Sequence, residues 1–374
     1  MRYSQVHRQR GFSLIELMIA VVLGLILLTA VIQIFIGNRK TQITEQSVAR
    51  VQESGRLAIN FIKDDLRQAG FAGSGAVPGT SQAATSDGFP VDNVTGDLRY
   101  DQYPAQAIRV YTKSDSGSWT PAAPGSDITD VVQPDAKNGS DLIATFDAYD
   151  TQMQVVGLAQ SSYDLIIEPT DSNTTADCAG LAKTFAGGQV IMLASPFGRA
   201  IFKVTSQSCT GTTTPTVTLQ HQEWSDPYPL SFKAGTHVLK FRDQHIYYVA
   251  DTGRKNAANQ AVWSLYRAVG DENGQELVEG IEFLKLQYGM RLSTGNMRYG
   301  VPASADDNKS IVVARVGVLS EGSDAVRTDD DTDTYTVAET KIGPDGSLQY
   351  DSGKVLRRAF TTDVELRNRA QETQ

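Results

Sequence analysis

The chain is short of the residues on which most catalytic and metal-binding motifs depend. Its 374 residues include two cysteines and four histidines, and neither set has the spacing of a zinc site or of a redox Cys-x-x-Cys pair. The Gly-x-Ser-x-Gly, His-Glu-x-x-His and P-loop motifs are missing too. We therefore expect no enzymatic turnover and no cofactor.

Positive charge is also in short supply. The 34 lysine and arginine residues are outnumbered by 43 aspartates and glutamates, for a formal net charge of −9. Because nucleic-acid binding depends on a basic surface, we expect no nucleic-acid partner. The hydrophobic fraction of 40% and the aromatic fraction of 8% are typical of a folded protein.

Charged side chains are absent from residues 12–36 with one exception, Glu16. Such a run is long enough to cross a bilayer as a helix, and it is longer than the apolar core of about 7–15 residues in a cleaved secretory signal. A plain membrane anchor would explain the length but not the acid, because a charge at membrane depth costs about 2.5–3.5 kcal/mol. Arg39 lies more than about 30 Å further along such a helix, so the cation for Glu16 must come from elsewhere.

The sequence around this acid resembles the type IV prepilin signal. Residues 11–18 read Gly-Phe-Ser-Leu-Ile-Glu-Leu-Met and follow a short basic leader. The resemblance implies that a prepilin peptidase cuts after Gly11 and removes residues 1–11. Phe12 then becomes the N-methylated first residue, and Glu16 pairs with the N-terminal ammonium of a neighbouring subunit.

No proline occurs before Pro78, so nothing obligatorily breaks a helix that begins at Phe12. Beyond the apolar run, small and apolar residues recur at spacings of three and four, as one helical face requires. They are Val48, Val51, Gly55, Ala58, Ile62, Leu66 and Ala69. We expect one helix over residues 12–70, membrane-spanning in its first half and amphipathic in its second. Residues 43–69 should pack on the head, and Gly70 should end the helix.

Residues 71–374 are predicted to form a large periplasmic head. Short segments rich in β-branched and aromatic residues alternate with turn formers, which is typical of antiparallel strands. Examples are residues 141–149, read as one strand, and the apolar segment 311–319, read as a central strand. The predicted fold class is α+β, with a long N-terminal α-helix packed on a mostly antiparallel β-rich head.

The two cysteines flank two predicted strands, residues 189–195 and 200–206. In an exported protein an isolated pair favours a disulfide over two unpaired thiols. We therefore expect Cys178 and Cys209 to be joined, clamping the ends of that hairpin.

One acidic segment allows a weak metal hypothesis. Asp329, Asp331 and Asp333 match the first positions of a calcium loop, but Thr334 and Thr340 stand where an EF-hand needs glycine and glutamate. A solvated acidic loop is the favoured interpretation, so no metal site is assigned.

Further stretches resemble the PilW family of minor pilins. They are ESGRLAINFIKDDLRQAGFAG, VEGIEFLKLQYGM, SIVVARVGVLSEGS and LRRAFTTDVELRNRA. The resemblance implies a single-pass inner-membrane subunit that helps initiate type IV pilus assembly and ends at or near the extracellular tip. Its partners would be other minor and major pilins, the prepilin peptidase, the inner-membrane assembly platform and a tip adhesin.

Two alternatives stay open. One is a minor pseudopilin of a type II secretion system, which shares the anchor and the β-rich head. The other is a membrane-tethered β-rich binding protein that never joins a filament, and it would leave Glu16 without an explanation.

Overall fold

A computed structural model gives the fold of most of the chain. It describes residues 13–71, 73, 91–92, 107–120, 124–158, 164–171, 177–195, 198–211, 214–221, 234–256, 259–292, 294–301 and 311–368. The predicted cleavage site, Gly11 and Phe12, lies outside the described residues.

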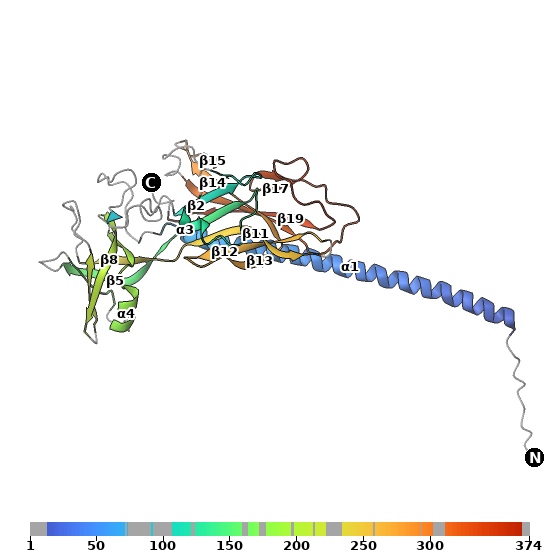
Figure 1. The fold of residues 1–374 in the computed structure, drawn as a ribbon, viewed down its shortest axis with the longest axis horizontal. Coiled ribbons are helices and arrows are strands. Elements are labelled where there is room, and N and C mark those ends of the chain that lie inside the picture. Colours follow the sequence, from blue (N-terminus) through green and yellow to red (C-terminus); the bar gives the residue numbers. More distant parts are fainter. Residues whose placement is uncertain are drawn as a thin grey trace, which may run out of the picture.

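A single helix, α1 (Leu14–Gln68), runs for 55 residues without a break, as predicted. Its first half extends away from the rest of the molecule and its second half lies against the head (Figure 1). Gly70 follows with a φ of +77°, a left-handed conformation that favours glycine after a helix end. The Asn368 side chain donates to the carbonyl oxygens of Gln68 and Ala69, at 3.0 and 3.1 Å, and so satisfies terminal acceptors of the helix.

The second half of α1 buries the predicted stripe with one exception. Its buried members are Ser47, Val51, Gly55, Ala58, Ile59, Ile62 and Leu66. Val48 stays 39% exposed, because it lies one residue, or about 100°, around the helix from Ser47, where contact with the head begins. At Gly55 the Phe360 ring fills the place that a β-carbon would take, so this glycine permits the closest approach of the helix to the sheet.

The part of the head that packs on α1 contains two main sheets and a small hairpin. The six-stranded sheet has the order β13 (Gln275–Glu279), β12 (Ala261–Val269), β11 (His245–Lys255), β4 (Asp141–Thr145), β2 (Ile108–Lys113) and β3 (Trp119–Thr120). The four-stranded sheet has the order β15 (Met297–Gly300), β14 (Ile281–Arg291), β16 (Ile311–Glu321) and β19 (Arg357–Glu365). The hairpin pairs β17 (Tyr335–Val337) with β18 (Thr340–Ile342), and a short helix, α3 (Ser126–Thr129), precedes β4. We call these elements, with the second half of α1, the body.

The remaining strands form a closed ring. In order around it they are β5 (Ala148–Leu158), β6 (Leu165–Pro169), β9 (Thr216–His221), β8 (Gly198–Thr210), β7 (Val190–Ser195) and β10 (Thr236–Phe241), which pairs with β5 again. The closure is possible because the long strand β8 pairs with β7 through its first half and with β9 through its second. We call this six-stranded antiparallel ring the barrel. A short strand, β1 (Val91–Asp92), joins β8 in parallel.

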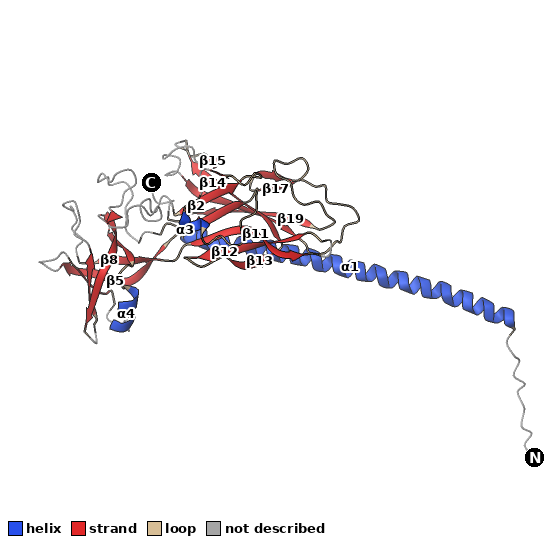
Figure 2. Cartoon of the chain, in the orientation of Figure 1, coloured by secondary structure: helices blue, strands red, loops and turns tan. Residues whose placement is uncertain are grey.

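The barrel is an insertion between two neighbouring strands of the body. Strand β4 ends at Thr145 and β11 begins at His245, and these two residues are register partners. The chain therefore leaves the body, builds the barrel and returns beside its point of departure. The single strand predicted for residues 141–149 is wrong for this reason, because the chain passes from β4 of one sheet to β5 of the other at Phe146 and Asp147. The barrel lies at the end of the head far from the N-terminus (Figure 2).

Body and barrel share one core, and the barrel has a second one inside its ring of strands. The shared core, which we call the body core, joins one face of α1 to the six-stranded and four-stranded sheets and to outward-facing barrel residues such as Met192 and Leu239. The central strand β16 contributes Ala314, Val316 and Val318 to it. The interior core of the barrel contains side chains from all six strands. It is covered by Leu181 of a short helix, α4 (Cys178–Thr184), and by Phe185, the residue that follows this helix. Apart from the β1–β8 pair, the described ladders are antiparallel, so the predicted α+β architecture is confirmed.

Candidate functional site

The exposed half of α1 is the first candidate. Large apolar side chains between Leu14 and Ile36 are 48–77% exposed. A continuous apolar surface of this kind is unfavourable in water and marks a site of contact with a membrane or another protein. Among the described residues, α1 is the helix that is long and apolar enough to cross a membrane. Length and exposure together fit a membrane anchor.

Glu16 lies in the first turn of this helix and is exposed. A carboxylate is favourable at this end, where the unpaired N–H groups carry partial positive charge. The sequence from Leu14 to Asn38 contains no lysine, arginine or histidine, so the helix itself offers Glu16 no cation within its apolar half. Pairing of Glu16 with a neighbouring subunit stays a prediction.

A polar junction fixes the other end of α1 to the body and the barrel. Asp65 accepts hydrogen bonds from His245, at 2.6 Å, and from Tyr247, at 2.5 Å. Burial disfavours the charge on Asp65, but the bonds from His245 and Tyr247 outweigh it and hold the pKa of Asp65 below its usual value. One turn further, Arg242 at the base of the barrel donates to Gln68, at 2.6 Å.

A buried ionic group inside the body was not predicted from the sequence. The Arg357 side chain is fully buried, with Nε 2.7 Å from Glu282 Oε2 and Nη1 3.4 Å from Asp331 Oδ2. Its Nη2 lies 3.4 Å from Glu321 Oε2. Lys137 approaches the other oxygen of Glu282, at 3.4 Å. We call these five residues the Arg357 cluster.

Burial shifts the pKa values of two members of this cluster. Burial and the nearby Glu282 raise the pKa of Glu321 to about 8, against the attraction of Arg357. Burial also lowers the pKa of Lys137. No pattern in the sequence brings these residues together, because they come from five separate segments.

The three aspartates of the calcium hypothesis do not converge. Asp331 is buried and accepts from Tyr335, at 3.0 Å, while Arg327 and Arg357 flank it. Asp329 and Asp333 are exposed. In the described part of the chain no three histidine, cysteine, aspartate or glutamate residues are grouped so that they could hold a metal ion.

The expected disulfide is present, with Cys178 and Cys209 joined and their Cα atoms 5.6 Å apart. It does not clamp the ends of a two-strand hairpin, because Cys178 begins α4 and Cys209 lies where β8 already pairs with β9. The bond therefore fastens α4 to the barrel wall. The sequence held a signal for this helix, since the Asp177 side chain accepts from the Gly180 amide at 2.7 Å as a typical N-cap.

Two family models match the chain, one near each end. Residues 6–32 match the Prokaryotic N-terminal methylation motif, and these residues include Gly11, Phe12 and Glu16. Residues 246–368 match the Type IV Pilus-assembly protein W, a segment that runs from β11 to just beyond β19. Comparison with curated proteins and with solved structures finds no match.

The matched segments correspond to parts of the structure with distinct roles. The first covers the exposed start of α1, and the second covers much of the body that packs on the same helix. The barrel lies outside both. Over these two segments the chain is similar to the family of type IV pilus assembly protein W and to prepilin-like proteins with an N-terminal methylation motif.

Proposed function

We propose that this chain is a minor pilin that helps initiate type IV pilus assembly and stays at or near the pilus tip. The observation that carries the proposal is the unbroken helix α1, which combines an exposed apolar half, one acid without its own cation, and a second half fixed in the head. Such a subunit acts by assembly and not by catalysis.

The physical steps follow from α1. Before assembly the apolar half lies in the inner membrane and the head lies in the periplasm. Glu16 is then a carboxylate at the edge of an apolar medium, where an unpaired charge is costly. The N-terminal ammonium of a neighbouring subunit offsets that cost, so pairing favours the assembled state.

The position of the barrel favours the tip. The N-terminal half of α1 projects from one end of the head, and the barrel occupies the other end (Figure 1). In a filament of stacked subunits, a subunit above would have to occupy the space beyond that end. A barrel of six strands obstructs such stacking, whereas a subunit at the tip has no neighbour above it.

The partners of this subunit would be other minor and major pilins, the prepilin peptidase and the inner-membrane assembly platform, with a tip adhesin as a further candidate. The methylation motif supports processing by the peptidase, and the pilus-assembly match supports contact with other pilus components.

The first test concerns Glu16. We expect Glu16→Ala to leave the chain processed and held in the membrane but to reduce piliation at least about tenfold, because the acid no longer favours the assembled state. Glu45→Ala is the matched control, since Glu45 is also an exposed acid of α1 but lies beyond the apolar run. Normal piliation with Glu16→Ala would refute the role of this acid.

The second test reads the N-terminus of the membrane-extracted chain by mass spectrometry, with and without the prepilin peptidase. A chain that begins at methylated Phe12 only when the peptidase is present supports the proposal. A chain that keeps Met1, or that begins beyond Ile36, would overturn it. Antibody labelling of sheared pili then tests the location, with label at filament ends expected.

A further inference from the structure

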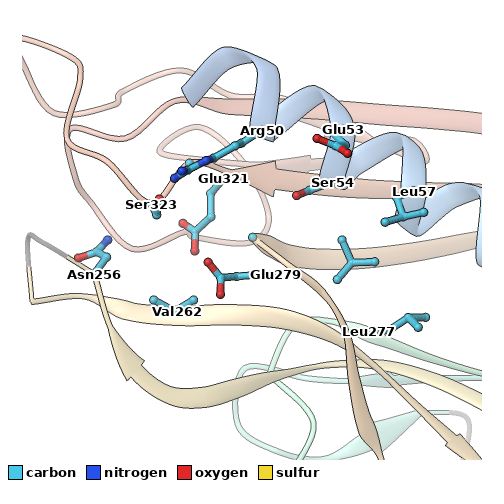
Figure 3. Close-up of a pocket in the computed structure, with 13 residues that line it drawn as sticks. Arg50, Glu53, Ser54, Leu57, Asn256, Val262, Leu277, Glu279, Glu321 and Ser323 are labelled. Carbon is cyan, nitrogen blue, oxygen red and sulfur yellow. The ribbon is translucent and has the colours of Figure 1, made fainter. Parts of the chain in front are cut away.

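A pocket of about 330 Å³ lies where α1 first meets the head. Arg50, Glu53 and Leu57 line it from the helix, and the ends of β13 and β16 line it from the body (Figure 3). Because the apolar half of α1 leaves the head on this side, the pocket opens near the face that a subunit lower in a filament would meet.

Part of the pocket wall is apolar. Leu57 is 42% exposed although it lies beside the buried stripe of α1, and Val262 and Leu277 stand opposite it. Such walls suit a chain of methylene groups, which gains by leaving water. They leave exposed apolar surface that the chain itself does not cover.

Carboxylates converge at the same pocket. The side chains of Glu279 and Glu321 point into it from the body in Figure 3. Glu53, on α1, makes no hydrogen bond or ion pair with any residue that the structure describes. Glu279 does have a partner, because its Oε2 lies 2.7 Å from Arg254 Nη2. Arg50, the basic residue of the described lining, turns toward Ser323 and lies 3.7 Å from Asp324.

Glu321 links the pocket to the buried Arg357 cluster. Its carboxylate lies 3.4 Å from Arg357 Nη2, and it is the member of the cluster that lines the pocket. In the described lining the carboxylates are those of Glu53, Glu279 and Glu321, and the cation is Arg50. The acids therefore outnumber the bases at the pocket, and acids without enough positive charge around them gain most from an added cation.

We propose that this pocket receives a lysine or arginine side chain of the neighbouring pilin subunit in the assembled pilus. The methylene stem lies between Leu57 and Leu277, and the charged end meets Glu53 and Glu321. The inference rests on the proposed function, because assembly is what brings a second subunit to this face. The pocket acids would then pair with a cation of a neighbouring subunit, in the same way as proposed for Glu16.

The experiment places a photo-reactive phenylalanine at Leu57 of the full chain in pilus-producing cells. We expect a crosslink to another pilin, mapped by mass spectrometry to a peptide with a lysine or arginine at the contact. Glu53→Lys and Glu321→Gln should each lower the crosslink yield about tenfold, the effect of removing one side of a close charge pair. Glu45→Lys, on the same helix but outside the pocket, is the control and should leave the yield unchanged.

A charge exchange makes the test decisive. Changing the mapped partner cation to glutamate should lower the yield, and combining that change with Glu53→Lys should restore it. Glu53 is exposed and has no described contact to lose, so this variant does not depend on a repacked core.

The outcomes separate the two proposals. A chain that enters pili but gives a crosslink indifferent to both substitutions, or one mapped to a peptide without a cation, overturns the pocket inference alone. A processed chain that never enters pili overturns the proposed function, and the pocket inference with it.

Discussion

The body and the barrel differ in which elements complete their hydrophobic cores. The body core is completed by α1, whose buried residues, Val51 to Leu66, come from far away in the sequence. The barrel core is completed by its own six strands and α4. The body therefore depends on the apolar helix for its core, whereas the barrel joins that core only through the outer faces of β5, β7, β8 and β10 and fills its interior without the helix. This division agrees with the family match, which covers body strands and no barrel strand.

The largest effect is expected in the body, at Arg357. Replacing it by methionine leaves Glu282 and Asp331 buried without their guanidinium, and breaking a buried ion pair costs about 3–5 kcal/mol. We expect Arg357→Met to lower hydrogen-exchange protection of β14, β16 and β19 in the detergent-solubilised chain while barrel strands keep theirs. Arg358→Met, at the exposed neighbour, is the control. An equal loss of protection in the barrel would show that the two cores unfold as one.

The converse experiment targets the disulfide. The two cysteines are 31 residues apart, and a disulfide that closes a loop of this length stabilises the folded state by about 3–4 kcal/mol in the chain-entropy account. We expect Cys178→Ser combined with Cys209→Ser to lower the free energy of unfolding of the barrel by that amount and to leave the body unchanged. Exchange rates of β6, β8 and β9 measure the effect. Loss of protection in β16 would contradict the independence of the two cores.

The smallest effect is expected at the junction. Burial raises the pKa of Asp147 to about 6, against the attraction of Arg242. Because the folded chain then binds this proton more tightly than the unfolded chain, with its value near 3.8, Asp147 lowers stability as pH rises from 4 to 6. After allowance for the partial exposure of Asp147, we expect the free energy of unfolding to fall by about 1–2 kcal/mol across this window.

The measurement at this junction is the difference in unfolding free energy between the natural chain and Asp147→Asn, followed from pH 4 to pH 7. The difference should change through that window and be constant above it. Asp130→Asn, at an exposed acid of the body, is the control. A flat difference for Asp147→Asn would mean that this carboxyl does not titrate with folding.

The anchor helix could be predicted because its signals are local. The length of the apolar run and the three-and-four spacing along α1 lie within one continuous segment, and so does the matched methylation motif at residues 6–32. Individual strands such as β7 and β16 were also visible, since alternation and β-branched composition are properties of a few neighbouring residues.

The rest depends on contacts between distant residues. Closure of the barrel requires β5 to meet β10 and β8 to bend from β7 to β9, and no short window of sequence encodes that choice. The break at Phe146 is hidden because apolar alternation continues through it. The Arg357 cluster joins five segments, so its acids and bases look like ordinary surface charges in the sequence.

The way in which the barrel is attached has a mechanical consequence. Its two connections leave from the same end of neighbouring strands, at the register pair Thr145 and His245. Tension between the barrel and α1 therefore pulls β4 and β11 lengthwise against β2 and β12, their outer partners in the sheet. Strands loaded in this direction must release their hydrogen bonds together and not one after another, so the joint resists a pull far better than its two thin connections suggest.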